Sequence, residues 1–162
     1  MKYAITFFTL LVFQVGHSQT QPEDLVQATI ETLFKGMKLG DSALVHQTFS
    51  ASPSFVSMGR DKQGKPFIRN EELKSFLKAV GTPHAEVWNE EIWGLKISVD
   101  GDFAQAWCDY AFYVSDTFSH CGVDAFHLHN DGTSWKIFHL ADTRRTEPCK
   151  IPATIQSKHA KK

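Results

Sequence analysis

Three side chains in the C-terminal half of the sequence could perform general acid–base chemistry if the fold brings them together. Asp109, Asp124 and His139 lie in three consecutive segments whose side chains alternate as in β-strands. If the turns centre on residues 116–117 and 131–132, antiparallel pairing places Asp109 opposite Asp124 and Asp124 opposite His139. Two carboxyl groups and an imidazole in an apolar cavity acquire different pKa values, as proton transfer at a carbonyl compound or hydrolysis requires. These three residues are therefore the catalytic candidates.

Two other interpretations of this cluster stay open. It can be a hydrogen-bonded polar patch in which His139 satisfies one aspartate, or it can bind a ligand without transforming it. Both are favoured over catalysis. The register itself is an assumption, because a slip by one residue exchanges the two faces of the sheet.

The same register predicts which side chains line a pocket. Four aromatic residues share a face with the acid–base cluster, and we expect them to bind a ligand: Trp107, Tyr113, Phe126 and Trp135. The opposite face is almost wholly apolar and contains Tyr110, Phe112, Val114, Val123, Ala125, Phe138 and Leu140. An aromatic pocket with a few polar groups suits a small, partly apolar molecule.

The segment DTRR, residues 142–145, follows the last strand-like run. Adjacent residues of a strand point to opposite sides, so Arg144 or Arg145, but not both, is expected at the pocket mouth, and Arg144 is the candidate for binding a ligand. A guanidinium there can hold a carboxylate or a phosphate in a forked contact. A salt bridge with Asp142, Glu147 or Asp124 is the alternative.

Signals for a metal or a cofactor are weak. The segment HLH places His127 and His129 on one strand face, and Cys121 could share it, but a zinc site needs three or four ligands and no acidic residue clearly joins these. The sequence has no Gly-rich phosphate loop, no G-x-S-x-G and no C-x-x-C. We therefore expect no metal and no cofactor.

The chain contains 3 cysteines, so at least one is left over from any pairing within the chain. Cys121 falls near the end of the last strand in the assumed register, and the chain can turn back from there to Cys149. A Cys121–Cys149 disulfide is expected, and it would contribute about 3 kcal/mol. Free thiols or an intermolecular link through Cys149 are the alternatives. Cys108 is expected to be a small buried side chain.

Residues 1–18 resemble a cleaved signal peptide, with Lys2, a short apolar run, and the small residues Gly16 and Ser18 before the cleavage point. The protein is therefore expected in the periplasm or outside the cell, with no membrane association after cleavage. Residues 19–149 are predicted to form one domain, and residues 150–162 a flexible basic tail. The formal net charge of −1 argues against nucleic acid as a partner.

Helices precede strands along the chain. Thr20 and Glu23 have the spacing of a capping box for a helix that ends near Gly40, and Asp41 can cap a second, short helix. Residues 53–69 suit a small hairpin or an ordered loop, and Asn70 precedes a third helix. From residue 86 onward the hydrophobic period is two, and four strands are predicted at 87–99, 103–115, 118–129 and 134–142. Short turns join them into an antiparallel meander, which makes the chain an α+β protein.

Over roughly residues 22–147 the chain resembles the NTF2-like superfamily. The resemblance lies in the order of elements, with helices first, then a small hairpin, then a long meander that closes with GTSWKIFHLADTRR. That superfamily includes SnoaL-like proteins, proteins described as lumazine-binding, and ketosteroid isomerases. Within it, the segments FSHCGVDAF and DTRR followed by a cysteine are most similar to small exported bacterial proteins of unassigned role.

The resemblance implies a cone formed by N-terminal helices packed on a curved, mainly antiparallel sheet. It also implies a small-molecule ligand in the cone and a homodimer formed through the sheet. The isomerases use a carboxylate base with a tyrosine and an acid at the oxyanion, and this chain shows no residue-by-residue match to that set. The expected role is binding of a small, partly apolar molecule, and an Asp/His enzyme in the same pocket is the alternative.

Overall fold

The computed structural model describes residues 20–160, so the expected signal peptide lies outside the described residues. The elements, in chain order, are α1 (Pro22–Leu39), α2 (Ser42–His46), β1 (Phe49–Arg60), β2 (Pro66–Glu71), α3 (Leu73–Gly81), β3 (Trp88–Asp100), β4 (Phe103–Val114), β5 (Thr117–Asn130), β6 (Trp135–Arg144) and α4 (Ala153–His159). No helix within residues 20–160 has the length and apolar character needed to cross a membrane.

Helix α1 starts differently from the sequence prediction but ends at the predicted glycine. Gln21 is the N-cap residue and its side chain makes no capping hydrogen bond, so the predicted Thr20–Glu23 capping box does not form. A proline in the first turn is compatible with a helix start because its missing N–H needs no partner there. Gly40 ends the helix with φ 67°, a left-handed conformation that glycine adopts without strain.

The region between the helices is a hairpin, as expected, but it is longer than residues 53–69. β1 and β2 pair antiparallel between Phe55–Glu71 and Arg60–Pro66. Because β2 continues to Glu71, α3 begins only at Leu73 and its N-cap is Glu72 rather than the predicted Asn70. The hairpin thereby carries α3 from the edge of the sheet back over one of its faces.

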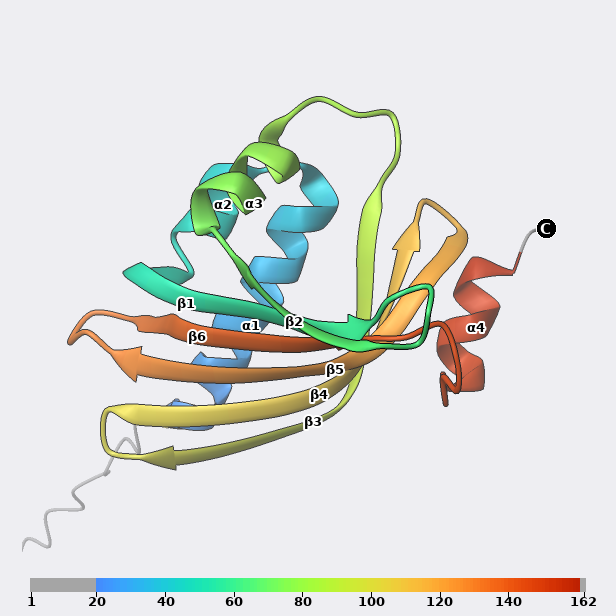
Figure 1. Cartoon of the computed structure of the whole chain (residues 1–162). Helices are drawn as coiled ribbons and strands as arrows, with labels where there is room; N and C mark the ends of the chain where they lie inside the picture. Colours follow the sequence, from blue (N-terminus) through green and yellow to red (C-terminus); the bar gives the residue numbers. More distant parts are fainter. Residues whose placement is uncertain (1–19, 161–162) are drawn as a thin grey trace, which may run out of the picture.

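The strands form one six-stranded sheet in the order β2-β1-β6-β5-β4-β3. β1 runs parallel to β6, and all other neighbours are antiparallel. Figure 1 shows a strongly curved sheet with α1, α2 and α3 gathered on one side, and with α4 apart from them. The α+β class, the N-terminal helices and the closing meander are therefore confirmed. We call the face toward α1, α2 and α3 the inner face, and the opposite one the outer face.

The predicted strand register is wrong at Asp124 by one residue toward β4 and by three residues toward β6. Asp124 pairs with Cys108 rather than with Asp109, and on its other side it pairs with Asp142 rather than with His139. The register shifts within the β4–β5 pair near Phe112 and again within the β5–β6 pair near His127. Each irregularity inserts one unmatched residue, and the side-chain period of two then moves every following residue to the other face.

The inner face is consequently the one that carries the small residues of β4. Ala104, Ala106 and Cys108 are buried in the same core cluster as Val26 and Ile30 of α1. Small side chains at these positions let the helix approach the sheet closely, and larger ones would hold it away. The outer face carries Trp107, which is 53% exposed.

The C-terminal segment is not the solvated tail that the sequence predicted. Residues 153–159 form α4, and Ile155 is buried against Ala111 and Tyr113 of the outer face. The His159 ring stacks on the Tyr113 ring with 3.7 Å between centroids, and Lys158 forms an ion pair of 2.8 Å with Glu91. The helix therefore covers one end of the outer face.

Gly122 is required by a close approach between β4 and β6. The Tyr110 hydroxyl, from β4, donates to the carbonyl oxygen of Thr143, on β6, at 2.9 Å. A Cβ atom on Gly122 would lie 1.7 Å from that carbonyl oxygen and 2.7 Å from the Tyr110 ring. The missing side chain is therefore what lets the tyrosine extend across β5.

We predict that Gly122→Ala lowers the free energy of unfolding by about 3 kcal/mol, because the added methyl group overlaps Thr143 and Tyr110. Urea denaturation followed by circular dichroism measures this. Val123→Ala, one residue along and on the other face, should cost about 1 kcal/mol. Equal losses for the two variants would contradict the crowding that the structure shows at Gly122.

Candidate functional site

A cavity of about 400 Å³ lies between α1, α3 and the inner face of the sheet. Its apolar lining consists of Met37, Phe55, Phe76, Ala79, Trp88, Phe112 and Val114, and its polar lining of Glu71, Ser75, Glu90, His120 and Arg144. A hollow of about 60 Å³ continues it inward to Asp124 and Asp142 and shares Glu90, His120 and Arg144 with it. We call the two together the cone cavity.

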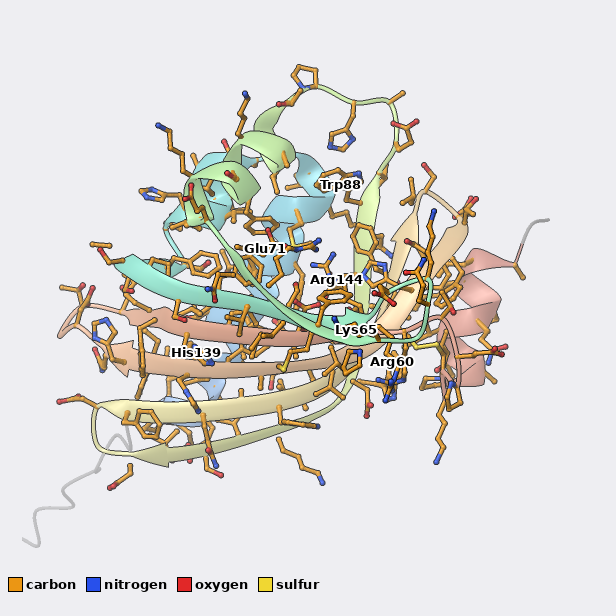
Figure 2. All side chains as sticks on the ribbon, in the orientation of Figure 1. Arg60, Lys65, Glu71, Trp88, His139 and Arg144 are labelled. Atoms are coloured by element: carbon orange, nitrogen blue, oxygen red, sulfur yellow. A yellow bond between two sulfur atoms is a disulfide. The ribbon has the colours of Figure 1, made fainter. Side chains whose placement is uncertain are left out.

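Figure 2 shows Glu71, Trp88 and Arg144 grouped in the space between α3 and the sheet, with His139 away from them. Trp88 comes from the start of β3 and Glu71 from the end of β2, the two edge strands of the sheet. The curvature of the sheet brings these edges toward α3, so both edge strands contribute side chains to the cavity lining.

Asp142 is the best-partnered carboxylate of the cavity floor. It is 5% exposed and accepts hydrogen bonds from Ser57 Oγ and from Arg144 Nε, the latter at 2.8 Å, while the Tyr110 hydroxyl lies 3.4 Å from Oδ2. The three donors come from β1, β6 and β4, respectively. A buried carboxylate needs such partners, because the loss of hydration is otherwise uncompensated.

Glu90 and Asp124 form a second, different carboxyl pair. Their side chains are hydrogen-bonded to each other, and apart from Glu90 no group among residues 20–160 donates to the buried Oδ2 of Asp124. Burial raises the pKa of Glu90 to about 7, and burial together with the neighbouring Glu90 raises the pKa of Asp124 well above its usual value. The pair therefore retains a proton near neutral pH.

His120 stands at the mouth of the cavity as a neutral imidazole. Burial, assisted by the Arg144 charge, lowers its pKa to about 4. Its ring packs against Phe112 and Tyr110, with centroid separations of 5.2 and 5.7 Å, and Ser119 Oγ lies 3.0 Å from Nδ1. A neutral imidazole in this position can accept or donate a hydrogen bond but brings no charge to a ligand.

The structure does not bring the three catalytic candidates together. Asp124 lies on the inner face and borders the cone cavity, whereas Asp109 and His139 project to the outer face because of the register difference. His139 stacks instead on His127, with 5.3 Å between ring centroids. Asp109 borders a separate hollow beside the Cys121–Cys149 disulfide. Of the three, Asp124 stays a candidate.

Of the five residues expected to bind a ligand, only Arg144 lines the cone cavity. Trp107 is on the outer face, and Tyr113 lies there under His159. Phe126 is a core residue whose ring contacts Phe34 edge-on at 6.3 Å.

Trp135, the fifth of these residues, is buried at the other end of the sheet, where it borders a different, polar hollow between α1 and the β5–β6 turn. Its Nε1 atom has no hydrogen-bond partner among the described residues.

The residues that sequence reasoning missed are those brought in by β1 and β3 and by the correct register. They are Ser57, Glu90, Tyr110, His120 and Asp142. One signal was available: Ala104, Ala106 and Cys108 alternate along one strand, and small residues at every second position indicate the face against which a helix packs. That face includes Tyr110 and, across the sheet, Asp124.

The expected Cys121–Cys149 disulfide is present, with 6.0 Å between the Cα atoms, and Cys108 is a buried free thiol as predicted. Burial raises the pKa of Cys108, which makes it a poor nucleophile. No group of three or more potential metal ligands occurs within residues 20–160.

Solved structures with this arrangement are known from several bacteria. An NTF2-like protein of unknown function from Shewanella baltica OS155 superposes with a TM-score of 0.56 at 17% identity, covering 80% of this chain and 100% of that one. The chain has the NTF2-like fold. An NTF2-like protein from Cytophaga hutchinsonii gives a TM-score of 0.61 at 10% identity, covering 78% and 100% of the two chains.

A third structure of this fold, a proposed dehydratase of the NTF2-like family from Streptomyces avermitilis, gives a TM-score of 0.58 at 11% identity, with 77% and 97% covered. No protein-family model and no curated protein matches the sequence. Identities this low carry the fold and not the chemistry, so the role of this NTF2-like chain has to be argued from its own cavity.

The raised pKa of Glu90 predicts a specific dependence of stability on pH. Between pH 4.5, the ordinary pKa of a glutamate, and about pH 7, Glu90 is protonated in the folded state but ionised in the unfolded state. Its contribution to the free energy of unfolding is therefore complete below pH 4.5 and is lost as pH rises through about 7. The lowered pKa of His120 acts oppositely, because its contribution is lost as pH falls from 6.5 to about 4. Above 6.5 only the carboxyl contribution changes.

We therefore expect the free energy of unfolding to fall by about 1 kcal/mol or more between about pH 6.5 and pH 8, since one pKa unit corresponds to about 1.4 kcal/mol. Urea titrations at several pH values measure this. Glu90→Gln should flatten the decline, whereas Glu86→Gln, at an exposed position, should preserve it. A decline that is unchanged in Glu90→Gln would show that another group is responsible.

Proposed function

We propose that this NTF2-like protein binds a small, partly apolar molecule in the cone cavity. The observation that carries the proposal is the cavity itself, about 400 Å³ with an aromatic wall and a few polar groups, of which Glu90, His120 and Arg144 also line the hollow toward Asp124. Small-molecule sites generally combine an apolar lining with a few placed polar groups that orient the ligand. The apolar part of the ligand would pack against Phe76, Trp88 and Phe112.

The polar end of the cavity defines what the ligand should carry there. The proton that the Glu90–Asp124 pair retains lies between the two carboxyl groups, so the other oxygen atoms of the pair are acceptors, and His120 is a neutral imidazole. A ligand hydroxyl group that reaches this end could donate to one of these carboxyl oxygens, and a carbonyl oxygen could accept from the imidazole.

Two further parts of the proposal concern the context of this protein. We infer export, for which residues 1–18 are the sequence argument and the Cys121–Cys149 disulfide is compatible support. We also infer a homodimer through the outer face, where Phe103 and Trp107 are 44% and 53% exposed beyond the part that α4 covers. Light scattering on the purified protein tests the dimer.

We predict that N-phenyl-1-naphthylamine, an uncharged probe that fluoresces in apolar surroundings, binds with micromolar affinity in the cone cavity. Ala79→Trp should weaken binding by about tenfold, because an indole at this exposed lining position occupies the cavity mouth. Trp107→Ser, on the outer face, is the matched control and should leave the affinity unchanged. If the two variants behave in the opposite way, the probe binds the outer face and the cavity proposal fails.

One observation favours an enzymatic role as a second candidate. Glu90 faces the cavity, is hydrogen-bonded to a second carboxyl group, and has a pKa of about 7, close to the value at which a general base works best near neutral pH. With Glu90 ionised, the carboxylate could remove a proton next to a carbonyl group, and the protonated Asp124 would support the charge. From the sequence resemblance we also infer the SnoaL-like subtype of this fold, for either role.

If this second role holds, the protein should accelerate exchange of the α-protons of 2-tetralone with D2O, followed by proton NMR. The rate should rise with pH through about 7 as Glu90 ionises. Glu90→Gln should reduce the acceleration by about 100-fold, and Glu86→Gln should not change it. Absence of exchange in the presence of demonstrated probe binding would leave binding as the role and exclude this chemistry for that ketone.

A further inference from the structure

A further hollow, on the surface of the protein, adjoins the cone cavity at the end of the sheet where β1 and β6 finish. It encloses about 720 Å³, and three arginines line it, Arg60, Arg144 and Arg145, together with Met58, Gly59, Pro66, Thr143 and Thr146. His120 also lines it, and so do two carboxylates, Asp61 and Glu147. We call this hollow the arginine groove.

Two of the three guanidinium groups lack a carboxylate partner. Arg144 is paired with Asp142, but no ion pair involves Arg60 or Arg145 among the described residues. Arg60 Nη1 donates to the carbonyl of Gly64 at 2.7 Å, and Arg145 Nε donates to the carbonyl of Pro148 at 3.0 Å. These bonds to neutral acceptors fix the side chains in place without compensating their charges.

The two carboxylates of the groove form no ion pair with these guanidinium groups among the described residues. Asp61 Oδ1 accepts the backbone N–H groups of Gln63 and Lys65, both at 2.9 Å, and so serves the turn between β1 and β2. Glu147 is exposed and forms no ion pair among residues 20–160. The groove therefore presents guanidinium N–H groups whose natural partner is an anion with two or more oxygen atoms.

The groove and the cone cavity meet at two side chains. His120 and Arg144 line both the main cavity and the groove, and also the inner hollow that leads to Asp124. Because His120 is neutral and Arg144 is neutralised by Asp142, the positive charge at this junction comes from Arg60 and Arg145. One molecule could extend from the aromatic wall past this junction into the groove.

The backbone around the groove is held firmly. Arg145 exchanges both backbone hydrogen bonds with Cys121, at 2.8 and 2.9 Å, and Cys121 is joined to Cys149 by the disulfide. On the other side, a Cβ atom on Gly59 would lie only 3.2 Å from the Arg144 carbonyl, which places the end of β1 tightly against β6. Arg60 and Arg145 are thus presented from two fixed strand ends, a condition for recognition by charge and shape.

We propose that the ligand of the cone cavity is an amphipathic anion. Its apolar body packs on the aromatic wall, and its carboxylate or phosphate binds in the arginine groove to Arg60 and Arg145. This rests on the proposed function and narrows it, since it names the chemical class of the ligand. The forked geometry of guanidinium groups suits carboxylate and phosphate alike, so the experiment has to separate the two.

The test uses three naphthalene compounds that share one apolar body. 1-Naphthol, 1-naphthoate and 1-naphthyl phosphate are each titrated against protein loaded with N-phenyl-1-naphthylamine, and displacement gives their affinities. The proposal expects at least one of the two anions to bind about tenfold more tightly than naphthol at low salt, with the difference shrinking as salt is added. The tighter of the two anions identifies the headgroup.

Variants then assign the preference to the groove. Arg60→Gln and Arg145→Gln should each reduce the affinity for the preferred anion about fivefold to tenfold while leaving naphthol affinity unchanged. Lys96→Gln removes the same charge from an exposed position of β3 outside the groove and should change neither affinity. If Arg145→Gln loses its fold because Arg145 hydrogen-bonds to the last loop, Arg60→Gln still decides the matter, because Arg60 is exposed.

The outcomes separate this proposal from the one on which it rests. If the naphthylamine probe and naphthol bind in the cavity but the anions bind no more tightly, the anion proposal is overturned and small-molecule binding stands. If an anion preference exists but survives both arginine substitutions, the groove is not its source and the proposal is likewise overturned. If neither the neutral probe nor any anion binds, the proposed function fails as well.

Discussion

The inner face of this protein depends on the hydrogen bonds that hold the buried carboxylate of Asp142. It sits near the end of β6 and is held by Ser57 from β1, by Arg144, and by the nearby hydroxyl of Tyr110 from β4. One acid thus links three strands, including β1, whose pairing with β6 is the only parallel one in the described sheet. Without these donors a carboxylate so far from solvent would be strongly destabilising.

The geometry that makes this network possible is the absence of a side chain at Gly122. The Tyr110 ring lies against Gly122, and its hydroxyl meets the Thr143 carbonyl beyond it. That carbonyl is available because the backbone N–H of Val123 bonds to the Thr143 hydroxyl instead. The hydrogen bonds around Asp142, the missing side chain at Gly122 and the interrupted β5–β6 backbone pairing at Thr143 therefore depend on one another. Together they form the floor of the cone cavity.

The network also divides the cavity into zones of different charge. Arg144 is engaged with Asp142, so it does not pair with Glu90 or Asp124, and these two must share a proton in a poorly hydrated site. The pair consequently carries about one negative charge rather than two at neutral pH. The guanidinium groups of Arg60 and Arg145, which form no ion pair among the described residues, lie outside, and the neutral His120 lines both their groove and the hollow that leads to the acid pair. An apolar molecule with a polar or anionic end fits that order of environments.

The sequence by itself determined the α+β class, the order of helices and meander, the disulfide, and Arg144 as a cavity residue, because hydrophobic period, turn residues and cysteine positions act locally. Tertiary structure decided which side chains share a face. Two register irregularities moved Asp109 and His139 to the outer face, and packing on the outer face ordered α4. The parallel pairing of β1 and the edge strand β3 then brought Ser57 and Glu90 to Asp124 and Asp142. Such long-range contacts leave no local pattern, since a period of two looks the same in either register.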